Sequence, residues 1–224
     1  MTYDLIMIVA SKDGDLILMT QAAIDSALAD GAQVNVILVE TFKEHPYKNV
    51  DNLLIYQGEF NYNRALNLGL SVAKGDIAIL ANNDIYFESG WSSIGHTMRQ
   101  NGYMSASALS DDKRMRVFKR GDYAYEGYVI GMHLAGWCIF MDREHVLNKI
   151  GPLDERFTFW YSDNAYAEQL QKAGLKHAMI CNAKVLHYTS STLSKEGADR
   201  RNLLTYAQGK KLLRTNSKNL QKKL

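Results

Sequence analysis

An acid and two amides follow an apolar segment in the first half of the chain. The segment Ile-Ala-Ile-Leu covers residues 77–80, and Asn82, Asn83 and Asp84 come just after it. Short polar side chains of this kind often form turns, because they bond to the neighbouring backbone. The tripeptide alone is therefore a turn signal, and the rest of the sequence has to show whether these side chains also form a site.

Other polar side chains occupy positions that fit a shared site. Glu40 ends a second apolar segment, and Gly-Pro-Leu-Asp-Glu-Arg-Phe at 151–157 precedes Ser-Asp-Asn at 162–164. His187 ends a third apolar run. The nucleotide-binding signatures G-x-G-x-x-G and G-K-S/T do not occur, which argues against a dinucleotide dehydrogenase or a P-loop phosphotransferase. No G-x-S-x-G elbow supplies a hydrolase nucleophile.

The spacing of apolar residues predicts alternating strands and helices over the first hundred residues. Short apolar runs predict strands at 4–10, 33–40, 53–56 and 77–80. Helical spacing and closing glycines predict helices at 16–31, 61–75 and 89–102. This alternation indicates an α/β fold with a mostly parallel central sheet and helices on both faces.

Sheets of this type bind ligands beyond the carboxyl ends of their strands. The predicted strands end near Ala10 and Ser11, at Glu40, at Tyr56 and at Asn82. Two of these exits carry acids, Glu40 and the Asp84 that follows Asn82. We therefore expect the strand exits to contain the functional site.

The second half of the chain is less regular, and its last part is basic. A strand is predicted at 136–142, a helix at 165–174, and strands near 176–180 and 183–187. From Ser194 onward nine Lys or Arg residues stand against two acids, with an apolar side that includes Tyr206. We expect a single domain over residues 1–192 and a basic helical tail over 193–224.

Composition excludes several classes of protein. The formal net charge of +2 over 224 residues argues against a strongly basic nucleic-acid binder. Cys138 and Cys181 stand alone among apolar neighbours, so we expect buried free thiols and no metal site built on cysteine. The N-terminus does not resemble an export signal and no apolar run approaches the length of a membrane span, so a cytoplasmic location is expected.

The order and spacing of the polar residues resemble those of GT-A fold glycosyltransferases, specifically the family 2 inverting enzymes, over about residues 3–192. The resemblance implies a Rossmann-like GT-A domain in which Asn82-Asn83-Asp84 stands for a D-x-D-like motif. It implies that Asp84 and His187 bind a divalent cation on the donor diphosphate, and that Asp163 is the catalytic base. The implied cofactors are Mn²⁺ or Mg²⁺ and a nucleotide-sugar donor, with a UDP-sugar favoured.

The sequence departs from the family pattern at three positions. Asn82 replaces the first acid of D-x-D, Glu40 stands where an Asp usually meets the base or ribose, and Ser162 replaces the first acid of the acidic pair. The Q-x-x-R-W motif of processive synthases does not occur, so the resemblance favours transfer of a single sugar over polymer synthesis.

The expected site residues fall into sets, and each has a purely structural alternative. The residues expected to bind the donor are Ala10, Ser11, Glu40, Asn63, Asn67, Asn82, Asn83 and Asp84. Those expected to bind the acceptor are Trp137, Asp154, Glu155, Trp160 and Tyr161. Asp163 can instead cap a helix, His187 can be an ordinary buried histidine, and the aromatic side chains can belong to the core.

The resulting hypothesis is a metal-dependent inverting glycosyltransferase that acts in glycan assembly. Its acceptor is a glycan or lipid-linked sugar, with the basic tail on an anionic membrane surface. One alternative is a phage-type transferase that glycosylates a hydroxylated base in DNA, with the tail and the basic cluster at 113–120 on phosphates. Another is an inactive protein that binds nucleotide sugar or glycan. A homo-oligomer is possible in each case.

Overall fold

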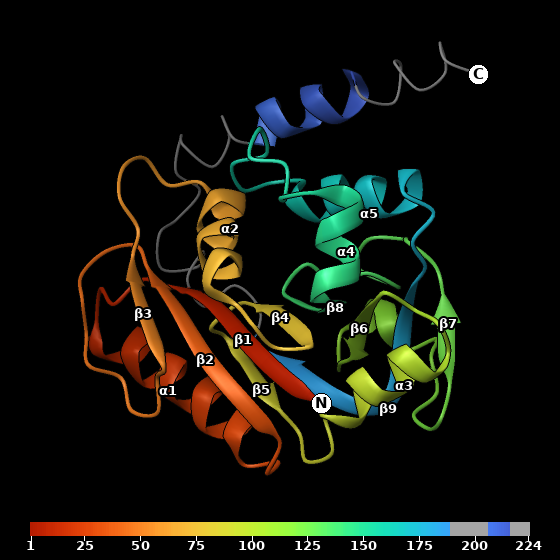
Figure 1. The fold of residues 1–224 in the computed structure, drawn as a ribbon, viewed down its shortest axis with the longest axis horizontal. Coiled ribbons are helices and arrows are strands. Elements are labelled where there is room, and N and C mark those ends of the chain that lie inside the picture. The colour runs from red at the N-terminus through yellow and green to blue at the C-terminus, as the bar shows by residue number, and fades with distance from the viewer. Residues whose placement is uncertain (189–205, 216–224) are drawn as a thin grey trace.

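A computed structural model describes residues 1–188 and 206–215 of the chain (Figure 1). The strands are β1 (Thr2–Val9), β2 (Gln33–Glu40), β3 (Asn52–Ile55), β4 (Ile77–Ala81), β5 (Ile85–Phe87), β6 (Ser105–Leu109), β7 (Ala124–Glu126), β8 (Cys138–Asp142) and β9 (His177–His187). The helices are α1 (Gly14–Leu28), α2 (Tyr62–Val72), α3 (Ser93–Gln100), α4 (Arg143–Ile150) and α5 (Ser162–Lys172), with a 3₁₀ turn at Lys113–Met115.

Helices cover both faces of the sheet (Figure 1). On one face, α1 and α3 contribute Ile24 and Met98 to a core that includes Met7 of β1. On the other face, α2, α4 and α5 pack against alternate residues of the same strands, including Ile6 of β1 and Leu80 of β4. Successive side chains of a strand point to opposite faces, so β1 contributes to both cores.

The strands form one mixed sheet in the order β3-β2-β1-β4-β8-β6-β9-β5, with β7 paired to β9. Strands β3, β2, β1 and β4 run parallel, as the sequence predicts. In the other half, β8 runs antiparallel to β4 and β6, and β9 runs antiparallel to β5 and β7. The α/β class with a mostly parallel central sheet is confirmed, because β6 and β9 pair in parallel and run in the same direction as β1 to β4. No α-helix separates β6, β7 and β8, and β7 and β8 are among the strands that run in the opposite direction, which short connections allow.

Several elements differ from the sequence-based expectation. The sequence does not predict strands β5, β6 and β7. Two of them, β5 and β7, have only three residues, and β6 consists mainly of Ser and Ala, so none of them forms a clear apolar run. The segments expected at 176–180 and 183–187 are one strand, β9. Helix α5 begins at Ser162, which places Asp163 in its first turn. Cys138 and Cys181 are buried free thiols, as predicted.

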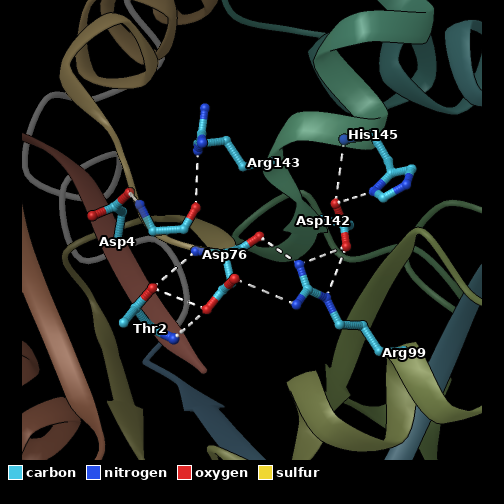
Figure 2. A network of polar contacts seen from close by, with 8 residues as sticks. Thr2, Asp4, Asp76, Arg99, Asp142, Arg143 and His145 are labelled. Atoms are coloured by element: carbon cyan, nitrogen blue, oxygen red, sulfur yellow. Dashed lines mark hydrogen bonds and ion pairs between the residues drawn. The ribbon is translucent and has the colours of Figure 1, made fainter.

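A polar network fixes the edge of the sheet at which β1 and β4 begin (Figure 2). The Asp76 carboxylate accepts hydrogen bonds from the amide and hydroxyl of Thr2 at 2.7 and 3.0 Å. Arg99 forms an ion pair with the buried Asp142 at 2.7 Å and lies 3.6 Å from Asp76. Asp142 also caps α4 by accepting from the His145 amide at 3.2 Å. The edge opposite the strand exits is thus held by charge-assisted contacts.

His177 is a fully buried histidine outside the candidate site. Its Nε2 lies 3.0 Å from the His133 carbonyl, which can only accept, so Nε2 carries the proton. Its Nδ1 then accepts from the Ser105 hydroxyl at 2.9 Å. Burial lowers the pKa of His177 to about 4, because the charged imidazolium would lose its water.

We expect His177 to make the fold sensitive to acid. The unfolded chain binds a proton near pH 6.5, whereas the folded chain does so only near pH 4, so stability falls as the pH drops through this window. At pH 5 the loss amounts to about 2 kcal/mol. Urea unfolding at pH 7 and pH 5 should show a smaller loss for His177→Gln than for the unchanged protein. The exposed control His96→Gln should behave as the unchanged protein, and equal losses in all three would contradict the assignment.

Candidate functional site

The carboxyl ends of β1 and β2 lie side by side, and Glu40 links the loops that follow them. The two strands pair in parallel with Val9 opposite Glu40. The fully buried Glu40 carboxylate accepts from the amides of Ser11 and Phe42 at 3.1 and 2.8 Å, and from the Ser11 hydroxyl at 2.5 Å. Because these contacts are internal, the expected donor contacts of Ser11 and Glu40 find no support. Ala10 lies at the strand exit, as expected.

The three polar residues after β4 point in different directions. Asn82 Oδ1 accepts a hydrogen bond from the Tyr62 hydroxyl at 3.0 Å. Asn83 Nδ2 donates to the Thr20 hydroxyl at 2.9 Å, so this side chain holds α1 instead of a donor. Asp84 directs its carboxylate toward the end of β9. Asn82 and Asp84 therefore remain candidates for chemistry.

Strand pairing places Asp84 against His187. β5 begins directly after Asp84 and pairs antiparallel with the end of β9, with Ile85 opposite His187. Trp137 stacks on the imidazole, with ring centroids 4.9 Å and planes 11° apart. Asp84 Oδ1 then lies 3.2 Å from His187 Nε2. The expected acceptor contact of Trp137 finds no support, because the ring is buried and one face covers His187.

The Asp84 and His187 side chains fit part of a metal site. The distance between Asp84 Oδ1 and His187 Nε2 is short, but their geometry is not that of a hydrogen bond. Both atoms are buried without a hydrogen-bond partner among the described residues. An unpaired buried polar atom costs about 1–3 kcal/mol. A divalent cation would engage both atoms, and an oxygen and nitrogen pair suits Mn²⁺.

The protein supplies only part of such a coordination shell. Within residues 1–188 and 206–215, no group of three or more His, Cys, Asp or Glu side chains is placed to hold a metal. The remaining ligands would have to come from a bound molecule and from water. This requirement suits a cation that arrives with phosphate oxygens.

Helix α2 holds the loop at 151–157 in place. Asn63 donates to the Asp154 carbonyl at 2.8 Å. Asn67 donates to the Leu153 carbonyl at 3.0 Å and accepts from the Leu153 amide at 2.9 Å. The expected donor contacts of Asn63 and Asn67 find no support, because both amides satisfy backbone groups of this loop.

Asp154 and Glu155 also make contacts within the protein. Asp154 pairs with Arg156 at 2.5 Å, and Glu155 pairs with Arg64 at 2.9 Å. Both acids line a pocket of about 390 Å³ beside α5. The α5 residues that line this pocket are Ala165, Glu168, Gln169 and Lys172. Helical periodicity puts them on the side of α5 away from Asp163, so an acceptor contact at Asp154 or Glu155 finds no support.

A strained turn presents Asp163. Tyr161, two residues earlier, has a left-handed backbone with φ of 68°, a conformation that is unfavourable for a bulky side chain. The Ser162 hydroxyl donates to the Phe159 carbonyl at 2.5 Å and closes the turn. Gly136 lies close by, since a Cβ atom there would be 2.8 Å from the Asp163 Cβ. Strain of this kind often occurs at functional sites.

The surroundings of Asp163 act on its charge in opposite directions. Burial raises the pKa of Asp163, while a hydrogen bond from the Asn164 amide and the positive charge of Arg114 lower it. Arg114 is held by two hydrogen bonds to Asp112, at 3.1 and 2.8 Å, and it lies against Gly131, where a side chain would collide with it. In the sequence, Arg114 is distinguished only as one residue of the basic cluster at 113–120.

Tyr62 is a site residue that sequence analysis misses. Burial, followed by the negative charges of Asp163 and Asp84, raises the pKa of Tyr62. Its hydroxyl therefore stays protonated, lies in the field of both candidate carboxylates and donates to Asn82. A tyrosine at the start of a predicted helix carries no signal of this role in the sequence.

Trp160 and Tyr161 contact a C-terminal helix at 206–215, which is the described portion of the tail expected at 193–224. The Tyr206 ring centroid lies 5.9 Å from that of Trp160 and 5.2 Å from that of Tyr161. The turn that these rings form leads directly into α5 and Asp163. The acceptor contacts of Trp160 and Tyr161 stay predictions. Both residues lie close to Asp163 in the chain, where an acceptor would have to bind. The remainder of the tail lies outside the described residues.

Two residues of the basic cluster at 113–120 are already paired. Arg114 pairs with Asp112, and Arg120 lies 3.2 Å from Glu88. The cluster is thus less basic than its composition indicates. No helix within the described ranges is long and apolar enough to cross a membrane.

Comparison with known proteins identifies the fold. No protein-family model matches the chain, and no curated protein matches its sequence. Among solved structures, GalNAc-T7 with UDP, GalNAc and Mn²⁺ matches with a TM-score of 0.67 at 11% identity, over 83% of this chain and 43% of that chain. S. aureus TarS 1-349 matches with a TM-score of 0.62 at 9% identity, over 84% of this chain and 60% of that chain.

Both matched structures are GT-A-type glycosyltransferases, and this chain has the GT-A fold. The chain spans less than two thirds of the length of either protein. At such low identity the likeness establishes the fold alone.

We expect Asn67 to stabilise the 151–157 loop more than the neighbouring ion pair does. Asn67→Ala leaves the amide and carbonyl of Leu153 without partners, which should lower the free energy of unfolding by about 1–3 kcal/mol. Arg64→Ala removes an ion pair with Glu155 whose side chains are 55% and 41% exposed, and solvent screening makes the expected loss smaller. Urea unfolding measures both, and an equal loss would contradict this assignment.

Proposed function

We propose that the protein is a metal-dependent inverting glycosyltransferase that moves a single sugar from a nucleoside-diphosphate sugar to an acceptor hydroxyl in glycan assembly. The proposal rests on Asp84 and His187 at the strand exits of a GT-A fold. Their facing atoms are buried, lie 3.2 Å apart and have no hydrogen-bond partner among the described residues. The GalNAc-T7 structure, which contains UDP and Mn²⁺, supports a nucleotide-sugar donor and a divalent cation here. The cytoplasmic location stays a prediction.

Asp84 and His187 would hold the cation in this reaction. A divalent cation bound there would stabilise the negative charge of the departing diphosphate. Trp137 stacks on the His187 ring and restricts its rotation. Nε2 of His187 is therefore held in the orientation that faces Asp84. Tyr62 and Asn82 form a neutral hydrogen-bonded pair beside this charge.

Asp163 would act as the general base. Its carboxylate takes the proton of the acceptor hydroxyl while that oxygen bonds to the anomeric carbon, and the bond to the diphosphate oxygen breaks on the opposite side. The position of Asp163 at the start of α5 favours the ionised form through the helix dipole. Burial opposes ionisation, and so strengthens the carboxylate as a base once it is charged.

The placement of the three groups supports turnover over simple binding. Asp84 and His187 are paired by strand register, and Asp163 is presented by a strained turn that a binding protein has no need to maintain. Both carboxylates also act on the Tyr62 hydroxyl, which indicates that they serve one region. These observations favour an active enzyme over an inactive nucleotide-sugar-binding protein.

The first prediction concerns the separate roles of the two acids. Release of nucleoside diphosphate from UDP-, GDP- and TDP-sugars should depend on Mn²⁺ and should select one donor. Asp84→Ala should abolish Mn²⁺-dependent donor binding, measured by calorimetry. Asp163→Asn should leave donor binding intact and slow turnover by roughly 10²–10⁴-fold.

The exposed Asp122→Asn provides a matched control, because it removes the same charge at a residue outside the proposed site, and it should leave both quantities unchanged. Failure of every donor to bind with any metal would overturn the proposal. Equal effects of Asp163→Asn and Asp84→Ala on donor binding would remove the basis for distinct roles.

The second prediction concerns pH. Because the pKa of Asp163 is raised, this base becomes protonated at a higher pH than an ordinary aspartate does. As the pH is lowered, turnover should therefore begin to fall at a pH above the usual pKa range of aspartate. Arg114→Gln removes a charge that lowers this pKa, and should shift the acid limb of the pH–rate profile further upward. A limb that does not move with Arg114→Gln would contradict this electrostatic role.

A further inference from the structure

The C-terminal helix at 206–215 is seated on the turn that presents Asp163. Tyr206 contacts both Trp160 and Tyr161. Gly209 approaches the backbone so closely that a Cβ atom there would lie 2.6 Å from the Trp160 carbonyl oxygen. The helix therefore belongs to the same surface as the candidate base.

The exposed side of this helix is basic. Lys210, Lys211 and Arg214 are exposed, and none of them forms an ion pair within the described part of the chain. Lys210 lies over the Tyr206 ring, with Nζ 5.7 Å from the centroid. The charge of Arg214 acts on the Tyr161 hydroxyl, which indicates that it lies near the aromatic turn. Lys210 and Arg214 thus lie beside the proposed acceptor region, and Lys211 is exposed on the same helix.

The seating of the helix argues against insertion into a bilayer. An amphipathic helix that lies in a membrane buries its apolar face among the lipids. Here Tyr206 and Gly209 of the helix are already engaged by Trp160 and Tyr161. Apart from the partly exposed Tyr206, the exposed side chains of the helix are small, polar or charged, and the charged ones recognise discrete anionic groups.

We propose that Lys210, Lys211 and Arg214 form an anion subsite that binds phosphate groups of the acceptor next to the hydroxyl that Asp163 activates. This inference rests on the proposed function. Lysine and arginine are the side chains that bind phosphate through charge-assisted hydrogen bonds. The acceptor is accordingly a phosphate-bearing molecule, and the C-terminal helix determines which hydroxyl compounds the enzyme uses.

Binding of inorganic polyphosphate tests the subsite without a known acceptor. The affinity of the full chain should be measured by calorimetry at several salt concentrations, for the unchanged protein and for Lys210→Glu/Arg214→Glu. Lys48→Glu/Lys74→Glu is the matched control, because it makes the same change in net charge at exposed lysines outside the helix. We expect affinity to fall with salt, a loss of at least tenfold in the helix variant, and a change within about twofold in the control.

Two results would overturn the subsite. Equal losses in the helix variant and the control would mean that polyphosphate senses only the total charge. Binding to vesicles of phosphatidylglycerol and phosphatidylcholine, without binding to polyphosphate, would assign the helix to a membrane surface. Much tighter binding to single-stranded DNA than to polyphosphate of equal charge would show recognition of nucleic acid, and would likewise reject the subsite as proposed.

The proposed function is tested separately by donor hydrolysis without an acceptor. The helix variant should retain this hydrolysis, because the donor side involves Asp84 and His187 instead of the helix. If the unchanged protein hydrolyses no donor, the transferase proposal fails while the polyphosphate result still decides the subsite. If the helix variant loses both donor hydrolysis and polyphosphate binding, the helix acts on the whole site and the anion subsite is rejected.

Discussion

The pairing of β5 with the last residues of β9 is the constraint on which the candidate site depends. β9 first pairs with β6 and β7, and then, beyond a shift of register near Ala108, its last residues pair with β5. This change of partners brings His187 to Asp84, far away in the sequence. The two facing polar atoms are buried and have no hydrogen-bond partner among the described residues, and burial of such atoms opposes folding. A ligand that engages both atoms would relieve this cost and stabilise the fold.

Local patterns predict β1 to β4 and the helices α1, α2 and α3 well, because these strands are short apolar runs and each of these helices has its own apolar periodicity. The family resemblance, which rests on the order of polar residues along the chain, points to Asp84, Asp163 and His187 as site residues, and this stays a prediction. The donor contacts expected of Glu40, Asn63 and Asn67 stay predictions, and in the structure these side chains bond to backbone groups of neighbouring loops. Whether a buried polar side chain binds a ligand or a neighbouring loop depends on which backbone groups tertiary packing leaves unpaired, and sequence spacing carries no information on that.

The departures from the family pattern have a physical explanation at one position. Asn82 accepts a hydrogen bond from the Tyr62 hydroxyl, whose pKa is already raised by burial and by the charges of Asp163 and Asp84. An acid at position 82 would add a third negative charge to this buried region. A neutral amide keeps the hydrogen bond without that repulsion. Nothing in the structure explains why Glu40 replaces an aspartate.

The position of β9 in the sheet has a consequence for synthesis of the protein. β9 is the last strand within residues 1–188 and 206–215, yet it lies between β6 and β5 in the sheet. A nascent chain that has emerged only as far as α5 carries two open sheet edges, and such edges promote association with other chains. It also carries Asp84 and Asp163 without His187. Asp84 and His187 can come together only after β9 has left the ribosome.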